Sequence, residues 1–482
     1  MFSNREIRLP AQKASRWVLH THRVATRVRT RRRDLGTLRG VRALATFCVS
    51  VLIMLAATSS ARANGRFPQS NQITMHPLNA DVIVARTTFG LLVSDDHGAN
   101  FHWICEQVLG TRLQEDPALT ITEDRSTLVS LYAGQRRGAP DRCSWEFVSP
   151  ALTGLAMADS IGVPGDARSA FVISSHTVFK TLDNGVSFAQ VGDMLSDVAL
   201  ETIEVAPSRP ARMYLSGAIP PTSSTPRQAF VFRSDDAGET WERFPFALGT
   251  GAQSDFNIYL AAVDPTNEAR VYMRVLGAPN DRLVVSDDAG ESFHEVLAIP
   301  SMRAFARSDD GGTIWAGSDT GALYRSQDRG EMFEPLSGLH ANCLYARGTE
   351  LWACGNNYTD GFVIGRSSDG GETFDAMLTL AGVQAGPTCA SGTPLQTVCG
   401  PMYDGLTTLF RPDAGIEDAG DPILDADVMD ATVPTGEPTG CACSTNGNAP
   451  ASVGTWGVLL FALFVLARAR GRDRSRSQAR RC

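Results

Sequence analysis

Six aspartates stand in the same eight-residue setting along this chain, Ser/Thr-x-Asp-x-Gly-x-x-Phe/Trp. Carboxylates can act as general acids, bases or nucleophiles, and two of them about 5 to 9 Å apart can hydrolyse a glycosidic bond. The aspartates are Asp96, Asp183, Asp236, Asp288, Asp328 and Asp369, and the glycines two residues further on are Gly98, Gly185, Gly238, Gly290, Gly330 and Gly371. Whether these carboxylates do chemistry depends on the elements that hold them.

The residues around each aspartate predict a turn and not a catalytic site. Each copy follows a short apolar stretch and begins another, which is typical of a β-hairpin. The carboxylate and the hydroxyl can accept backbone N–H groups within the turn, and the glycine supplies a positive φ. The aromatic ring starts the outgoing strand and can be buried. We therefore expect all six aspartates to be structural and none to be catalytic.

The spacing of the copies predicts the fold. They recur at intervals of about 40 to 50 residues, which in a strand-rich chain indicates a β-propeller. The one longer interval contains a damaged copy at residues 141–145, and a remnant without its aromatic lies at 411–415. With both included, residues 64–411 are predicted to form a single all-β propeller of four-stranded blades. The count favours eight blades, and seven remain if the last unit is not a blade.

Two further segments are assigned by their place in this period. Residues 308–315 match the motif but fall between two of its regularly spaced copies. They are therefore predicted to be the turn between the first two strands of their own blade. Residues 66–73 are predicted to close the ring by supplying the missing outer strand of the last unit.

The motif resembles the Asp box, or BNR repeat, of sialidases, sortilin-type receptors and photosystem assembly factors, where it is a structural fastener. Resemblance to sialidases implies an arginine triad, a Phe/Tyr-Arg-Ile-Pro motif, a Tyr–Glu pair and an acid/base aspartate. The near match to that motif, IRLP at residues 7–10, lies in the leader. Xyloglucanase-type enzymes place catalytic aspartates between two propellers, and one is predicted here. We expect a non-catalytic binding or scaffolding module for a glycan or protein, with a sialidase-like glycoside hydrolase as the alternative.

Residues 1–63 are predicted to be a basic leader and signal peptide. Arginines dominate the first 42 residues, an apolar run follows at 43–60, and Ala-Arg-Ala at 61–63 forms a cleavage site. This order is typical of a secretory signal. The body of the protein is therefore expected to be exported.

The C-terminal part is predicted to hold a spacer and an anchor. Residues 412–440 are acidic and poor in large apolar residues, as in disordered linkers. Residues 441–482 contain Cys441 and Cys443, a short apolar run predicted to form a transmembrane helix, and an arginine-rich tail. This order resembles the MYXO-CTERM sorting signal of myxobacteria and relatives. The resemblance implies cleavage and anchoring at the cell surface or outer membrane of a Gram-negative bacterium, with Cys441 or Cys443 as the sorting or lipidation site. A plain tail anchor is the alternative.

Six of the ten cysteines lie in the exported body, an even number that predicts disulfides in an oxidising compartment. Cys343 and Cys354 flank a polar turn, so a hairpin would place them opposite one another. The same reasoning pairs Cys389 with Cys399. Cys105 and Cys143 remain and are predicted to link the first two blades.

The remaining expectations concern partners. The formal net charge is −8 and the positive charge is concentrated at the two ends, so nucleic-acid binding is not expected. The body lacks a Cys-x-x-Cys pair with nearby histidines, and the spacer lacks the glycine and glutamate of an EF-hand, so we expect no metal site and no cofactor. We expect a monomer, a membrane contact through the C-terminal segment, and ligand-binding loops at residues 217–228 and 249–255.

Overall fold

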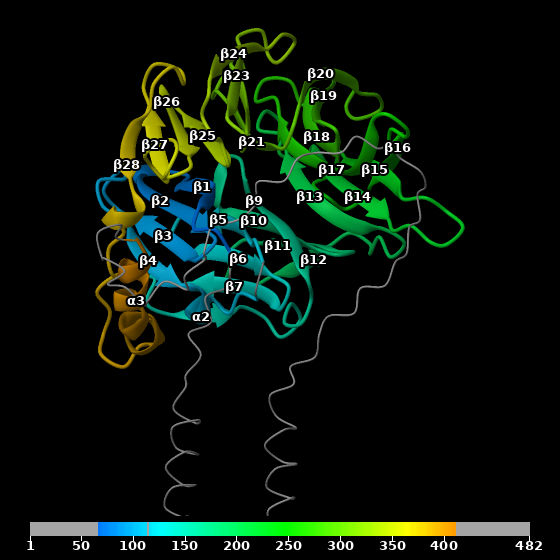
Figure 1. Ribbon diagram of the computed structural model, residues 1–482. Helices are drawn as coiled ribbons and strands as arrows, with labels where there is room; N and C mark the ends of the chain where they lie inside the picture. Colours follow the sequence, from blue (N-terminus) through cyan, green and yellow to red (C-terminus); the bar gives the residue numbers. More distant parts are fainter. Residues whose placement is uncertain (1–65, 113–114, 411–482) are drawn as a thin grey trace, which may run out of the picture. The chain divides into compact units, whose positions relative to one another are not determined.

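The computed structural model of the chain describes residues 66–112 and 115–410, and these form seven antiparallel sheets of four strands each (Figure 1). In every sheet the spatial order of the strands follows their order in the sequence. Each sheet is one blade, numbered here from 1 to 7 along the chain. Figure 1 shows the blades following one another around a centre, as in a β-propeller.

Each blade consists of a first, second, third and fourth strand in chain order. The first strands are β1 (Ser70–His76), β5 (Ala118–Ile121), β9 (Met157–Val163), β13 (Ala199–Val205), β17 (Ser254–Val263), β21 (Met302–Arg307) and β25 (Cys343–Arg347). The second strands are β2 (Asn79–Thr87), β6 (Thr127–Leu131), β10 (Asp166–Ser174), β14 (Met213–Ile219), β18 (Val271–Ala278), β22 (Ile314–Ser318) and β26 (Glu350–Cys354). The third strands are β3 (Gly90–Ser94), β7 (Gly134–Gly138), β11 (Val178–Thr181), β15 (Gln228–Ser234), β19 (Asp281–Ser286), β23 (Ala322–Ser326) and β27 (Ile364–Ser367). The fourth strands are β4 (His102–Cys105), β8 (Trp145–Phe147), β12 (Ala189–Val191), β16 (Glu242–Phe246), β20 (His294–Ile299), β24 (Glu334–Ser337) and β28 (Asp375–Leu378).

The hydrophobic core lies between neighbouring blades. Val231 of β15 in blade 4, for example, packs in one cluster with Ile258 of β17 and Val284 of β19 in blade 5. The second and third strands read as nearly continuous apolar runs because both of their faces are covered by a neighbouring blade. Burying each such valine or leucine contributes about 1.5 to 3 kcal/mol.

The meander of four antiparallel strands sorts the turns onto two faces. Turns between first and second strands and turns between third and fourth strands lie on the same face, which we call the box face because it carries all the boxes. The connections between second and third strands, and those from one blade to the next, lie on the opposite face. Residues 308–315 form the turn between β21 and β22 and the start of β22, as expected. The damaged copy at 141–145 lies between β7 and β8, at the same place as the intact boxes.

The predicted count of eight blades is wrong, because seven sheets are formed. The segment after β28 turns into helices and does not form another sheet: η1 (Leu380–Gly382), η2 (Leu395–Cys399) and α3 (Gly400–Phe410). The remnant at 411–415 lies outside the described residues. Residues 380–410 are called the C-terminal extension below.

The predicted ring closure through residues 66–73 is also wrong. Ser70–His76 form the innermost strand of blade 1, and blade 7 is completed by its own four strands. The C-terminal extension instead reaches back to blade 1. The Trp103 amide of β4 donates to the Gln384 carbonyl (3.0 Å), and the Gln384 amide donates to the Phe101 carbonyl (2.9 Å). The extension thereby covers the outer strand of blade 1, which is buried, whereas most residues of the other outer strands are exposed or half-buried.

Disulfides hold this extension in place. Cys105 is bonded to Cys399, and Cys143 is bonded to Cys389. The predicted pairs Cys389–Cys399 and Cys105–Cys143 are therefore wrong, because residues 389–399 fold into a turn and a helix and not into a hairpin. The helix η2 places Cys399 against Cys105 at the end of β4, and the preceding loop brings Cys389 to the damaged box of blade 2.

The third bond, Cys343–Cys354, is the pair that the hairpin spacing predicts, and it joins opposite residues of β25 and β26. Within residues 66–112 and 115–410, no helix is both long and apolar enough to cross a membrane. The segments predicted to be a signal peptide, a spacer and a sorting signal all lie outside these ranges.

Candidate functional site

The box of blade 5 shows what its aspartate does. The buried Ser286 hydroxyl donates to Asp288 Oδ1 (2.8 Å) and accepts the Gly290 amide (2.8 Å). Asp288 Oδ1 also accepts the Ser292 amide (2.8 Å), and Oδ2 accepts the Ser292 hydroxyl (2.5 Å). Both carboxylate oxygens are thus engaged inside the turn.

The other boxes repeat these bonds. In blade 4, hydrogen bonds from the Thr240 hydroxyl and amide and from the Ser234 hydroxyl lower the pKa of Asp236 to about 2. In blade 6, Met332 stands where the other boxes have a hydrogen-bonding side chain. Met332 donates to Asp328 through its backbone amide and not through its side chain. The residue before each box glycine also has a positive φ, as at Ala289 (62°) before Gly290 (88°). The second of these two left-handed residues is glycine because a side chain disfavours a φ near 90°.

The boxes also join neighbouring blades. Arg270 of blade 5 donates to the Arg329 carbonyl (2.9 Å) and to Glu331 (2.7 Å) in the box of blade 6. The Tyr272 hydroxyl reaches the same carbonyl (2.8 Å). In blade 7, the Gly370 carbonyl accepts the indole N–H of Trp315 from blade 6 (2.8 Å). The box carbonyls therefore receive donors from the preceding blade.

The centre of the ring carries a carboxyl pair that the sequence analysis missed. Asp159 of β9 accepts the Ile203 amide of β13 (3.1 Å), and Glu204 follows in β13. Burial among the channel walls raises the pKa of Asp159 to about 6, although the Ile203 and Ser160 amides act against the shift. Burial, and then the charge of Asp159, raise the pKa of Glu204 to about 8, while Arg307 of β21 opposes the shift.

Glu204 is half-buried, and no hydrogen-bond partner for its carboxyl group is found among the described residues. Its raised pKa favours the protonated form at neutral pH, and a protonated carboxyl is what general acid catalysis uses. The available signal for Glu204 was an acidic residue between the apolar residues Ile203 and Val205 of one strand. No local motif marks this residue, because its role depends on the strands of other blades that surround it.

A second polar cluster lies where β13 and β17 begin. Glu201 Oε1 accepts the Arg227 guanidinium (2.9 Å) and the Asn257 amide (2.9 Å). The Asn257 amide also donates to the Tyr259 hydroxyl (3.1 Å). A register shift between Asp255 and Asn257 bends β17 here, and such bulges commonly redirect a side chain.

This cluster brings together the two loops that the sequence suggested for binding. Arg227 belongs to the loop at 217–228. The loop at 249–255 is held by Asp255, whose buried carboxylate accepts the Gly249 amide (2.5 Å) and the Arg282 guanidinium (2.5 Å). Both loops therefore lie on the opposite face, at blades 4 and 5.

A hollow of about 230 Å³ lies beside the cluster, between β17 and β21. Tyr259, Arg274, Met302, Arg303 and Phe305 are among its lining residues. Arg274 pairs with Asp281 (3.3 Å) and Arg303 with Asp319 (3.0 Å), so the hollow carries little net charge.

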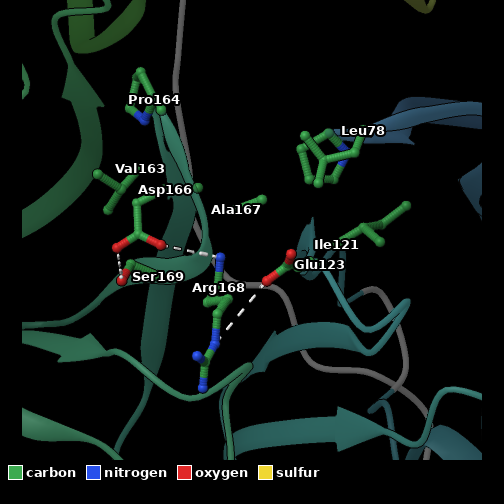
Figure 2. A pocket seen from close by; sticks show the side chains of 12 residues that line it. Leu78, Ile121, Glu123, Val163, Pro164, Asp166, Ala167, Arg168 and Ser169 are labelled. Atoms are coloured by element: carbon green, nitrogen blue, oxygen red, sulfur yellow. Dashed lines mark hydrogen bonds and ion pairs between the residues drawn. The ribbon is translucent and has the colours of Figure 1, made fainter.

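A larger hollow of about 480 Å³ lies on the box face of blades 1 to 3 (Figure 2). Figure 2 shows Asp166 directed at Ser169 and Arg168 directed at Glu123. Asp166 accepts the Ser169 hydroxyl (2.5 Å), and Arg168 lies 4.0 Å from Glu123. Asp166 is thus bound to Ser169 and Arg168 lies near Glu123, which makes this hollow the weaker candidate for a binding site.

One group of side chains has the composition of a metal site. Asp287, His294 and Glu331 place three possible ligand atoms within 4.8 Å of one another, and all three residues are exposed. Arg270 already binds Asp287 (2.5 Å) and Glu331 (2.7 Å). The Arg270 guanidinium supplies the positive charge that a metal ion would otherwise bring. The cluster is therefore an ion-pair network that joins blades 5 and 6.

Exposed aromatic rings mark the opposite face. In the part of the chain that the structure describes, five large aromatic side chains are exposed, and all lie in its connections or at strand ends that reach it: Phe67, Tyr132, Phe147, Phe256 and Tyr358. Phe67 and Tyr358 pack against each other with ring centroids 5.6 Å apart. On the box face the exposed large apolar residues are aliphatic: Leu78, Leu182, Val186 and Met332.

Comparison with known proteins gives likeness in structure alone. No family model matches the sequence, and no curated protein matches it. Among solved structures, the GH74 xyloglucanase from Xanthomonas campestris is 14% identical, with 63% of this chain and 52% of that chain covered and a TM-score of 0.47. An ancestral GH74 enzyme is also 14% identical, with 64% and 46% covered and a TM-score of 0.47. The chain thus spans about half the length of these two.

A further solved structure, YCF48 bound to D1 peptide, is 13% identical, with 60% of this chain and 89% of that chain covered and a TM-score of 0.41. At such identities the likeness concerns the propeller fold and not the function. The function is therefore assigned from the residues of the site itself.

Proposed function

We propose that this protein is a surface-displayed, non-catalytic propeller of the Asp-box (BNR-repeat) type that binds a glycan or protein ligand. The observation that carries the proposal is that the exposed aromatic side chains all lie on the opposite face, where two of them, Phe67 and Tyr358, pack against each other. Exposed apolar side chains gathered on one face mark interaction sites, and aromatic residues are enriched there. The candidate loops at 217–228 and 249–255 open on the same face.

The proposal assigns the box aspartates a structural role. Their carboxylates accept hydrogen bonds from the turn that contains them, which leaves them poorly placed to meet a ligand. The boxes also face away from the aromatic side chains. Binding and blade assembly are thus separated onto the two faces of one ring.

Display at the surface rests on the terminal segments. We propose that residues 1–63 direct export, that 64–411 form the propeller, that 412–440 act as a disordered spacer and that 441–482 act as a MYXO-CTERM-like sorting signal with a membrane helix. The protein would act as a monomer held to the membrane through its C-terminus. Disulfides in the described part favour an oxidising compartment.

The test is to apply the purified full chain to a glycan array and to an array of surface and secreted proteins. Release of sugar from aryl glycosides and polysaccharides is measured in parallel. Saturable binding to either array without sugar release supports the proposal. Sugar release that disappears in Glu204→Gln would contradict it.

A secreted glycoside hydrolase is the alternative, and Asp159 with Glu204 is the observation that favours it. Glu204 would protonate the leaving oxygen, and Asp159 would act as base or nucleophile. The expected signature is a rate that falls as pH rises through about 8 and depends on both carboxyls. Retention of that rate in both Asp159→Asn and Glu204→Gln would exclude the pair.

A further inference from the structure

The polar cluster of blades 4 and 5 contains buried groups that lack a partner. Asn257 is 6% exposed, and both of its amide hydrogen bonds go to Glu201 and Tyr259. Its Oδ1 is buried and has no hydrogen-bond partner among the described residues. The reversed amide would place two acceptors, Oδ1 and Glu201, against each other, so the observed orientation is the favourable one.

Two further donors, on the cross-strand partners Tyr259 and Arg274, are also unused. Tyr259 accepts the Asn257 amide, and no acceptor for its own hydroxyl proton is found within the described ranges. Arg274 Nε is buried without a partner there, although the rest of its guanidinium lies near Asp281. A buried group such as Arg274 Nε is destabilising when it is left unpaired. An occupant that supplies one donor and two acceptors would remove this cost.

The hollow between β17 and β21 fixes the size and polarity of that occupant. Tyr259 and Arg274 both line it, and Asn257 touches Tyr259. Its 230 Å³ is below the usual range of about 300 to 1,000 Å³ for ligand pockets, so it suits a small group of a larger ligand. Met302 and Phe305 give it an apolar wall. The arginines are paired with carboxylates, which disfavours a net charge on the ligand.

We infer that this hollow is a subsite for one residue of a neutral carbohydrate. A sugar hydroxyl donates and accepts through the same atom, which matches an unpaired acceptor beside unpaired donors. The C–H face of the sugar ring would pack on the apolar wall. The inference rests on the proposed binding function and names its ligand class. A peptide offers its N–H and C=O groups at fixed backbone spacing, and it is the alternative that the experiment separates.

The test uses the full chain on an array of neutral and sialylated oligosaccharides, followed by titration calorimetry with the neutral oligosaccharide that binds best. Asn257→Leu is expected to weaken binding about tenfold or more, and Tyr259→Phe about three- to tenfold. Gln190→Leu is the matched control because it changes an exposed amide on the outer strand of blade 3, and its affinity should stay within about twofold. Melting curves show whether each variant folds, and Tyr259→Phe carries the test if Asn257→Leu does not.

Unchanged affinity in a folded Asn257→Leu and in Tyr259→Phe would overturn the subsite. Binding to sialylated sugars only, or to proteins only, would also overturn it, while leaving the proposed binding function standing. A chain that binds neither glycans nor proteins on the arrays would overturn both, so the two failures are distinguishable.

Discussion

Ser286 holds its turn through a hydroxyl that is fully buried. The group donates to Asp288 and accepts the buried Gly290 amide, so its loss leaves a donor unpaired away from water. We expect Ser286→Ala to lower the free energy of unfolding by about 1 to 3 kcal/mol. Asp288→Ala should cost less, because the Ser292 amide that it releases is exposed and can bind water. Urea unfolding measures both.

Ser292→Ala is the control for this prediction. It removes an exposed hydroxyl from the same turn, and the expected change is within about 0.5 kcal/mol. Equal losses for Ser286→Ala and Ser292→Ala would mean that burial of the hydroxyl is not the cause.

The channel carboxyls make stability depend on pH. Burial raises the pKa of Glu204 to about 8 and that of Asp159 to about 6, above the value of about 4 in an unfolded chain. The folded state therefore binds more protons than the unfolded state. The stability linked to these protons is complete below about pH 4 and is lost as pH rises through 6 and 8.

We expect Glu204→Gln to melt at a higher temperature than the parent at pH 9 and near the same temperature at pH 5. The amide keeps the shape of the protonated acid but never ionises. Melting curves from pH 5 to pH 9 test this, with the exposed Glu239→Gln as control. A parallel fall of both curves between pH 7 and pH 9 would mean that another group causes the dependence.

The sequence predicted the role of a residue where its hydrogen-bond partners lie close to it along the chain. The box residues bond within eight positions of one another, so motif and spacing were enough to identify the turn. Glu204, Asn257 and Tyr259 acquire their roles from strands of other blades. A single sequence does not show which blade faces which, and these residues could not be identified from it.

At the scale of elements, the C-terminal extension replaces an eighth blade. Its covalent contacts are the buried bond Cys105–Cys399 and the half-buried bond Cys143–Cys389. Peptide mapping of the oxidised protein should recover these two bonds together with Cys343–Cys354. Recovery of Cys105–Cys143 or Cys389–Cys399 would show that the extension does not lie on blades 1 and 2.

The two bonds should differ in their response to a thiol reductant. Cys143 and Cys389 are half-buried, whereas Cys105 and Cys399 are 0% and 2% exposed. Under native conditions with limiting reductant, alkylation should label Cys143 and Cys389 first, because attack requires access to the sulfur. Labelling of Cys105 and Cys399 at the same rate would indicate that the extension opens as a unit.

The error in cysteine pairing has a physical cause. Ten residues between two cysteines fit a hairpin, and at Cys343 and Cys354 a Gly-containing turn with flanking apolar residues forms one. Nine residues separate Cys389 from Cys399, which is a similar spacing, but this segment enters a turn and then the helical stretch that ends at Phe410. Phe410 packs on Phe89 of blade 1, and no pattern in the nearby sequence predicts this contact.

At the scale of the whole molecule, seven blades were within the predicted range, although the preferred count was eight. The period of the boxes gave the architecture, because each blade repeats the same turn at the same place. It could not give the last unit, since a remnant of the motif at 411–415 looks the same whether or not strands surround it. The decision came from residues 380–410, which form helices.

The anchoring proposal makes a prediction about the mature protein. If residues 441–482 are a sorting signal, the surface form should end near Cys441 or Cys443 and lack Trp456 onward. The apolar run is shorter than the roughly 20 residues of a stable membrane span, so a modified cysteine would hold better. Mass spectrometry of shaved surface protein measures the end.

Replacing both Cys441 and Cys443 with serine should leave the precursor in the inner membrane. The propeller is unaffected by that change and serves as the internal control through its melting temperature. An intact chain ending at Cys482 on the cell surface would instead identify a plain tail anchor.

The two bonds to the C-terminal extension also decide how the protein carries mechanical load. Tension applied beyond Phe410 reaches Cys399 first and passes through sulfur into Cys105 on blade 1, while Cys389 gives a second path into blade 2. Blade 7, whose sheet would otherwise be peeled strand by strand, is bypassed. A propeller held by its C-terminus and pulled through a bound ligand would therefore take the load at blades 1 and 2, and β28 would not be stripped from blade 7 by it.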